Sequence, residues 1–349
     1  MDAINYKKFK EFDNHKLVVK IEDEAVGLKG FIAIHNTNLG TPAVGGTRML
    51  PYKTEKDALK DVLKLSRAMT YKCAIAKVPY GGAKGVIIGN PKKGKTSALL
   101  KAYARKINSL QGQFCTGEDV GITQGDVNTM LEVSEYFIGK PDLAADPSPY
   151  AALSTFYAIQ SAVQFVHQKD SLRGISVAIK GVGKVGEALI ELLYGVGAIV
   201  YASDVDKVVL AGVKKKFPKI KMVDNRKIRA MAVNVYSPCA LGDEFSMKNV
   251  GKVKAKIICG AANNQLAENN VGDWLFKHNV IYIPDYVANA GGLINVVDEL
   301  EKDGYKKSRV LERIKEVKTT VKKILDLSVA ENRSPHRVAD EIAESYFKR

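Results

Sequence analysis

The feature that most constrains the fold is an alternation, between residues 175 and 283, of short apolar segments with helical or loop segments. The apolar segments are residues 175–179, 199–202, 231–236, 257–259 and 280–283. Short buried strands that alternate with helices are typical of a parallel, doubly wound sheet with right-handed crossovers. We therefore predict an α/β protein in which residues 146–334 form a doubly wound, Rossmann-type domain.

A glycine loop follows the first of these strands. The sequence GVGKVG, Gly181–Gly186, lies between the strand SVAIK and the helical segment EALIELLYG. In a dinucleotide fingerprint, Gly181 permits the tight turn, Gly183 lets the pyrophosphate approach the backbone, and Gly186 lets the helix pack against the strand. Lys184 and Val185 complete the predicted cofactor loop at the start of the helix.

Asp204 follows the second strand, at about the 20-residue spacing expected for the acid that binds the ribose. A carboxylate there accepts hydrogen bonds from a free 2′-hydroxyl and repels a 2′-phosphate, so NAD is favoured over NADP. Asp206 is the alternative acid, but it lies beyond the expected end of the strand.

The first third of the chain mixes strands and helices. Residues 17–21 and 31–35 are rich in β-formers, and residues 54–76 have helical periodicity, with Thr54 and Asp57 as a capping pair. Three prolines in the segment IGKPDLAADPSP, residues 138–149, then interrupt regular structure, and we interpret this segment as an interdomain hinge. These patterns predict a separate α/β domain over residues 1–145, completed by the C-terminal helix 335–349.

Two lysines stand out in the stretch AMTYKCAIAKVPYGGAKGVII, residues 68–88. Lys72 lies among apolar residues at the end of the expected helix, and Lys84 follows what we interpret as a Gly-Gly-Ala turn. Lysine side chains often extend to water, but two lysines around a glycine turn are less easily explained in that way. Neighbouring cations disfavour each other's charge, so one amine could act as a base while the other binds a carboxylate.

Composition excludes several other classes of protein. No apolar run approaches the roughly 18 residues of a membrane span, and the charged start MDAINYKKFKEF does not resemble an export signal, so we expect a cytoplasmic protein. The four cysteines form no CxxC pair, which argues against structural zinc and a disulfide framework. The net charge of +15 comes from scattered lysines without interleaved aromatics, so we expect no nucleic-acid partner.

Six motifs occur in an order that resembles the glutamate, leucine, phenylalanine and valine dehydrogenase superfamily. They are GGTRMLPY at 45–52, MTYKCA at 69–74, GGAKGVI at 81–87, GEDVG at 117–121, GAANNQL at 260–266 and PDYVANAGGLINV at 284–296. The resemblance covers essentially the whole chain and is greatest to the leucine-specific branch. It implies reversible NAD-dependent oxidative deamination of an L-amino acid to a 2-oxo acid and ammonium by a homo-oligomer. It also implies that residues 1–145 form the substrate and oligomerisation domain.

The resemblance also implies roles for individual residues. Lys72 matches the lysine that pairs with the substrate carboxylate, Lys84 the lysine that activates water, and Asp119 the acid that exchanges protons with the amine. Asn263 matches an asparagine near the substrate and the nicotinamide. Residues that match the lining of the substrate site are Gly45, Gly46 and Met69.

The resemblance favours an apolar substrate, because Val44 stands where glutamate-specific relatives carry a lysine. An apolar wall does not offset the cost of burying a second carboxylate. The residues expected around the substrate side chain are Val44, Gly117, Leu293 and Val296. We expect leucine, valine or isoleucine, with a phenylalanine or tryptophan dehydrogenase as the alternative, since Gly117 could make extra room.

The chain departs from the superfamily pattern at three positions. Ala151 stands in place of a threonine that contacts the carboxamide of the nicotinamide, Ala83 in place of a glycine, and Asp146 in place of an asparagine. A non-catalytic NAD-binding protein is therefore a further alternative. The presence of Lys72, Lys84 and Asp119 together argues against it.

Overall fold

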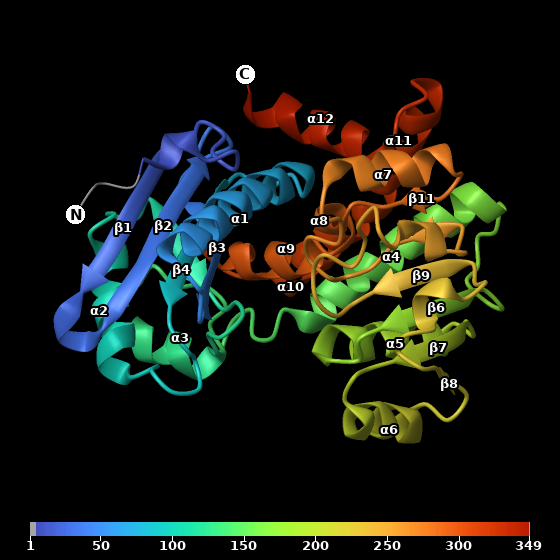
Figure 1. Ribbon diagram of the computed structural model, residues 1–349, viewed down its shortest axis with the longest axis horizontal. Coiled ribbons are helices and arrows are strands. Elements are labelled where there is room, and N and C mark those ends of the chain that lie inside the picture. The colour runs from blue at the N-terminus through green and yellow to red at the C-terminus, as the bar shows by residue number, and fades with distance from the viewer. Residues whose placement is uncertain (1–4, 349) are drawn as a thin grey trace. The chain divides into compact units, whose positions relative to one another are not determined.

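The computed structural model describes residues 5–348, which form two compact units (Figure 1). The first unit contains the described residues up to Asp146, together with Val296–Tyr305 and the segment that begins at Ala343. The second contains Pro147–Asn295 and Lys306–Ile342. The outermost residues of the domain ranges expected from the sequence, 1–4 and 349, lie outside the described residues.

The first unit contains a five-stranded mixed sheet in the order β1-β2-β4-β3-β5. Its strands are β1 (Leu17–Asp23), β2 (Leu28–Asn36), β3 (Ala43–Leu50), β4 (Gly81–Ile88) and β5 (Phe114–Gly117). β2 is antiparallel to β1 and β4, whereas β3 is parallel to β4 and β5. The two strands predicted in this region, residues 17–21 and 31–35, are confirmed.

Strand alternation assigns the two faces of this sheet to different helices. Phe31 and Ala33 of β2 pack against Leu59 of α1 (Glu55–Ile75), within a cluster that also contains Val62 and Leu63. Their neighbours on β2, Ile32 and Ile34, point the other way and join a cluster with α2 (Ser97–Asn108) and α3 (Gln124–Leu131). The predicted helix is confirmed, and the Thr54 side chain caps it by accepting a hydrogen bond from the Asp57 N–H at 3.1 Å.

The predicted glycine turn before Lys84 is wrong, because residues 81–88 form strand β4. The glycines of β4 allow neighbouring backbone to pack closely against this strand. A Cβ on Gly82 would stand 2.1 Å from the backbone nitrogen of Thr70 in α1, and one on Gly81 would stand 2.2 Å from the Asn36 carbonyl oxygen. Consecutive glycines are typical of turns, but in β4 they let a helix and a neighbouring backbone come into contact with the strand.

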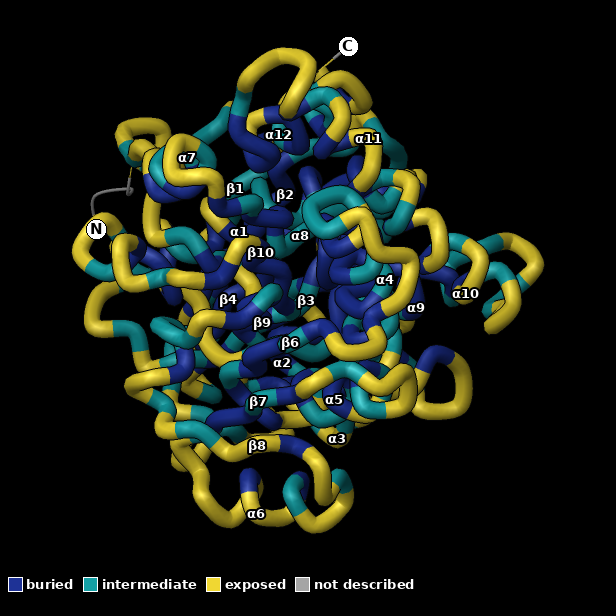
Figure 2. The backbone as a smooth tube through the Cα atoms, turned by 90° about the vertical axis from the view of Figure 1, so that its right-hand side faces the viewer, coloured by how far each residue is buried: buried dark blue, intermediate teal, exposed yellow. Residues whose placement is uncertain are grey.

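The second unit contains an all-parallel sheet in the order β11-β10-β9-β6-β7-β8, which confirms the doubly wound fold. Its strands are β6 (Ser176–Lys180), β7 (Ile199–Ser203), β8 (Lys221–Met222), β9 (Val235–Pro238), β10 (Ile257–Ile258) and β11 (Ile281–Tyr282). The helices that begin in this unit are α4 (Ser148–His167), α5 (Lys184–Gly195), α6 (Lys207–Lys216), α7 (Asn269–Lys277), α8 (Asp285–Ala288), α9 (Gly291–Val297), α10 (Lys307–Lys315), α11 (Val317–Ala330) and α12 (Pro335–Phe347). The last residues of α9 and of α12 belong to the first unit. Figure 2 shows β6 as buried and much of α6 as exposed.

Two strands differ from the sequence expectation. β9 begins at Val235 rather than at Met231, because Ile228–Ala230 form a 3-10 helix and the apolar residues that follow pack into the core without pairing. β8 was not predicted. It is two exposed residues long and therefore has no apolar pattern.

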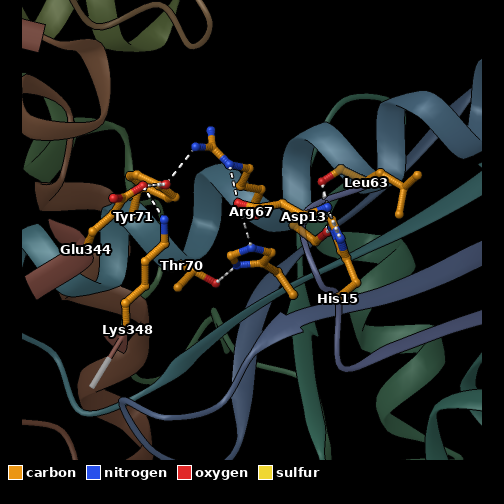
Figure 3. Close-up of polar contacts among 10 residues, drawn as sticks. Asp13, His15, Leu63, Arg67, Thr70, Tyr71, Glu344 and Lys348 are labelled. Carbon is orange, nitrogen blue, oxygen red and sulfur yellow. Dashed lines mark hydrogen bonds and ion pairs between the residues drawn. The ribbon is translucent and has the colours of Figure 1, made fainter. Parts of the chain in front are cut away.

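The end of α12 is bound to the first unit by a polar network (Figure 3). The Tyr71 hydroxyl of α1 donates to Glu344 Oε1 at 2.5 Å and accepts from Arg67 Nη2 at 2.6 Å. Arg67 Nε donates in turn to Asp13 Oδ2 at 2.7 Å. Because Arg67 and Tyr71 flank Met69 on α1, the network fixes the part of the helix that carries a predicted site residue.

No helix within residues 5–348 is long and apolar enough to cross a membrane.

Candidate functional site

The glycine loop of the second unit connects β6 to α5. Gly181 has a φ of +95°, and a Cβ at this position would stand 2.8 Å from Ala240. A Cβ on Gly186 would stand 2.1 Å from the Gly181 carbonyl oxygen, whereas the space beside Gly183 is open to 4 Å. Gly183 is the N-cap of α5, and Lys184 and Val185 begin the helix. A tight turn, a close helix–strand contact and an open backbone at a helix N-terminus are the features that a pyrophosphate requires.

Asp204 follows β7 directly and contacts the glycine loop. Its Oδ2 accepts a hydrogen bond from the backbone N–H of Val182 at 2.8 Å, and its Oδ1 accepts one from Asp206 at 2.9 Å. The Asp206 side chain instead caps α6, where it accepts hydrogen bonds from the N–H groups of Val208 and Val209. Of the two acids, Asp204 is therefore the one beside the predicted cofactor loop.

An ion pair in the first unit joins two of the predicted site residues. Lys84, in the middle of β4, is only 6% exposed, and its Nζ contacts Oδ2 of Asp119, which follows β5. Arg48 Nε lies 3.4 Å from the same oxygen, and the Val120 N–H donates to Asp119 Oδ1 at 2.8 Å. Burial acts to raise the pKa of the Asp119 carboxyl, but the Lys84 and Arg48 cations outweigh it and hold this pKa well below its usual range.

The predicted lining residues of the first unit gather around this ion pair. Cγ of Met69 lies 3.2 Å from the position that a Cβ on Gly45 would take, and a Cβ on Gly46 would stand 2.9 Å from Cβ of Asp119. The half-buried Lys72 lies in the last turn of the same helix as Met69. The two glycines therefore let β3 pack closely against Met69 and Asp119, and these predicted residues lie near one another in the first unit.

The apolar residues predicted for the substrate side chain are placed as follows. Val44 is fully buried in β3, where it pairs with Gly82 and Cys115. Gly117 pairs with Gly46 at the end of β5, and a Cβ on Gly117 would stand 2.7 Å from the Ile138 carbonyl oxygen. The space beside its Cα is therefore already filled.

Val296 lies next to a loop that the half-buried carboxylate of Glu299 holds in place. Its Cγ1 is 3.8 Å from the position that a Cβ on Gly139 would take. Glu299 accepts hydrogen bonds from the N–H groups of Gly139, Lys140 and Ala144 at 3.2, 2.9 and 3.1 Å. The sequence analysis gave Glu299 no role, because its partners are backbone groups about 155 residues away along the chain.

In the second unit, the amide oxygen of Asn263 accepts a hydrogen bond from Nδ2 of Asn289 at 2.8 Å. Asn263 itself is exposed, whereas Asn289 is only 3% exposed. With its oxygen bound in this way, the Asn263 amide presents its NH₂ group as a donor. Leu293, also predicted for the substrate site, is buried in α9 of this unit.

The sequence analysis also gave no role to Arg48 or Asp61. Arg48 belongs to the motif GGTRMLPY, and it lies two residues after Gly46 on the same face of β3. Its Nη1 is 3.2 Å from Asp61 Oδ2 of α1. The strand period relates Arg48 to Gly46, so the face of Arg48 could have been predicted, but its contact with Asp61 depends on tertiary structure.

Two family models match this chain. The family model described as "Glu/Leu/Phe/Val dehydrogenase, dimerisation domain" matches residues 14–140, and the one described as "Glutamate/Leucine/Phenylalanine/Valine dehydrogenase" matches residues 203–344.

Three curated relatives are similar over nearly the whole chain. Leucine dehydrogenase of Geobacillus stearothermophilus is 38% identical over 97% of this chain and 92% of its own. Phenylalanine dehydrogenase of Thermoactinomyces intermedius is 40% identical over 96% of this chain and 92% of its own. L-tryptophan dehydrogenase of Nostoc punctiforme is 39% identical over 95% of this chain and 92% of its own. The crystal structure of the last superimposes with a TM-score of 0.81 at 38% identity, covering 95% of this chain and 96% of that one.

Proposed function

Because the chain belongs to the Glu/Leu/Phe/Val dehydrogenase family of NAD(P)-dependent amino acid dehydrogenases, we propose that it oxidatively deaminates a branched-chain L-amino acid, with leucine preferred and NAD as cofactor. The observation that carries this proposal is the buried Lys84–Asp119 pair, with Asp119 packed against Gly46. It combines a proton-accepting carboxylate and an amine, the two groups that deamination requires.

In the proposed mechanism, Lys72 binds the substrate carboxylate and Asp119 takes a proton from the substrate amine. NAD, when bound, supplies the acceptor for the hydride that leaves Cα. Lys84 then removes a proton from the water molecule that adds to the resulting imino carbon. Asp119 returns its proton to the nitrogen, the C–N bond breaks, and the proton of the new hydroxyl passes to the departing ammonia. The products are a 2-oxo acid and ammonium, and the proton taken up by Lys84 is released to solvent.

The proposed preference for NAD rests on Asp204. Its carboxylate accepts hydrogen bonds from two backbone N–H groups at 2.8 and 2.9 Å, so its oxygens are fixed beside the glycine loop. A fixed negative charge there favours a ribose with a free 2′-hydroxyl over one with a 2′-phosphate.

The proposed preference for an aliphatic side chain rests on Val44 and Gly117. Val44 is apolar and fully buried, and it offers no partner to a side-chain carboxylate. The Ile138 carbonyl occupies the space beside the Cα of Gly117, which argues against extra room for the substrate at this position. This favours leucine, valine and isoleucine over the larger phenylalanine and tryptophan.

An aromatic substrate is the second candidate. The relatives named as leucine, phenylalanine and tryptophan dehydrogenases are all 38–40% identical to this chain, so overall similarity does not separate them.

We test substrate and cofactor together by following NADH or NADPH formation at alkaline pH. The substrates are leucine, valine, isoleucine, phenylalanine, tryptophan and glutamate, each with NAD and with NADP. The highest kcat/KM is expected for the branched-chain set with NAD. Highest activity on phenylalanine or tryptophan would replace the substrate and keep the mechanism, and activity on none would refute the proposal.

We further propose that the protein is a symmetric homo-oligomer, supported by the match of residues 14–140 to a dimerisation domain. Light scattering coupled to size-exclusion chromatography is expected to give a multiple of the 38.1 kDa chain mass. A mass equal to one chain at micromolar concentration would contradict this.

A further inference from the structure

We propose that Arg48 is a positioning residue for the reaction: a permanent cation that holds Asp119 toward Lys84 and keeps it a carboxylate when Lys84 gives up its proton. This inference rests on the proposed function, because it assigns a task within the same site.

The guanidinium of Arg48 lies between two carboxylates from different elements. Its Nε is 3.4 Å from Asp119 Oδ2, and its Nη1 is 3.2 Å from Asp61 Oδ2. Asp61 is itself held by Tyr52, whose hydroxyl donates to the same oxygen at 2.5 Å. The Arg48 side chain is only 15% exposed, so little water screens these contacts.

Asp119 therefore has two cations on one oxygen, and they differ in chemistry. Lys84 can exchange a proton, whereas a guanidinium stays charged throughout the pH range of enzymes. While Lys84 is neutral, Arg48 is the remaining cation in contact with Asp119 Oδ2 among the described residues. The Val120 N–H occupies the other oxygen, so the carboxylate is held at both ends.

The charges along this row of side chains alternate. Tyr52, Asp61, Arg48, Asp119 and Lys84 follow one another as neutral donor, anion, cation, anion and cation. Burial acts to lower the pKa of Arg48, but Asp119 and Asp61 outweigh it. Burial and Asp61 raise the pKa of Tyr52, which keeps this hydroxyl a donor.

The first test is the pH dependence of kcat/KM for the preferred amino acid in the full chain. Arg48→Met is expected to lower kcat on the order of tenfold, a part of what general acid–base catalysis contributes. Arg48→Met should also move the acidic limb of the pH profile of kcat/KM about one pH unit higher. The reason is that removal of a cation makes the Lys84–Asp119 pair release its proton less readily.

Three further variants separate positioning from a purely structural role. Arg48→Lys is expected to return the acidic limb close to that of the parent, because it restores the charge. Asp61→Asn should move the limb in the opposite direction to Arg48→Met, because it removes an anion. Arg226→Met removes the same charge at a side chain that is 91% exposed, and no shift is expected. An acidic limb that is unchanged in Arg48→Met would overturn the inference.

A second test does not depend on activity. Lys84→Met imitates the neutral state of Lys84, and ¹³C NMR of the Asp119 carboxyl then reports its protonation. In Lys84→Met the carboxyl is expected to stay ionised at neutral pH. In Lys84→Met/Arg48→Met, burial should raise the titration midpoint by about two pH units.

Equal midpoints in the two variants would overturn the role of Arg48 even if the enzyme is active. If the parent is inactive on every amino acid, the proposed function fails, and the NMR titration still decides whether Arg48 keeps Asp119 charged. If the double variant does not fold, the pH profiles of Arg48→Met and Asp61→Asn decide whether Arg48 acts through its charge. Opposite shifts in Arg48→Met and Asp61→Asn support the inference, and shifts in the same direction contradict it.

Discussion

The chemistry proposed at the residue scale depends on an unusual position for a lysine. Lys84 lies on a central strand, where a lysine is rarely buried, and the carboxylate of Asp119 provides its counter-charge. A buried ion pair is weak evidence for stability, because desolvation offsets much of the attraction. This favours a chemical reason for the pair.

We predict that Lys84→Ala loses amino acid oxidation almost completely while NAD still binds, because the glycine loop lies in the other unit. Steady-state kinetics and calorimetric NAD titration measure the two properties. Lys95→Ala is the matched control, since Lys95 forms a comparable ion pair with Asp126 at 2.5 Å, and its activity is expected to stay near that of the parent. Normal turnover in Lys84→Ala would remove Lys84 from the mechanism.

We predict that Asp204→Ser relaxes the preference for NAD, because the negative charge opposite a 2′-phosphate is lost. The measurement is the ratio of kcat/KM with NAD to that with NADP. Asp206→Ser is the control, since this residue caps α6, and its cofactor ratio should stay constant. An unchanged ratio in Asp204→Ser would contradict the assignment of the ribose-binding acid.

We predict that Val44→Lys lowers kcat/KM for leucine at least tenfold, because it places an ammonium without a partner among buried apolar atoms. A thermal unfolding scan shows whether the variant is folded, and glutamate is tested as the substrate that could supply the missing partner. Leucine turnover equal to that of the parent would exclude Val44 from the substrate site.

At the element scale, the contact between α1 and β4 places the site. Helix α1 brings Met69 to Gly45, and the glycines of β4 let the two elements approach closely. The apolar periodicity of α1 and the alternation of β1 and β2 were readable from the sequence, since local patterns define them. The strand at residues 81–88 could not be predicted from the sequence, because a glycine pair looks the same in a turn and in a tightly packed strand.

The same distinction applies to the site. The glycine loop and Asp204 follow from spacing along the chain, so the sequence indicated them directly. Glu299 binds backbone N–H groups that lie 155 or more residues away along the chain. Asp61 is 13 residues from Arg48, but their contact depends on how α1 packs against β3. Neither leaves a pattern in the sequence of a single chain.

We predict that Gly82→Ala destabilises the protein by about 2–3 kcal/mol, because its Cβ would stand 2.1 Å from backbone of α1 and neither element can yield easily. Urea unfolding measures this change. Gly212→Ala is the control: nothing lies within 4 Å of its Cβ in α6, and the variant is expected to gain up to about 1 kcal/mol. A Gly82→Ala variant as stable as the parent would show that close packing does not require this glycine.

At the scale of the whole molecule, the two units carry different parts of the proposed reaction. The first carries the lysines, Asp119 and Arg48, and the second carries the glycine loop, Asp204 and Asn263. Family membership agrees with this division, since separate family models match residues 14–140 and 203–344.

The most direct test of the central claim is the fate of the hydrogen on Cα of leucine. The protein is incubated with L-leucine deuterated at Cα and with NAD, and the products are analysed by mass spectrometry. One deuterium is expected in each reduced cofactor, with one 2-oxo acid and one ammonium formed per turnover. Reduced cofactor without deuterium, or no reduction with leucine or any other amino acid of the panel, would contradict the account.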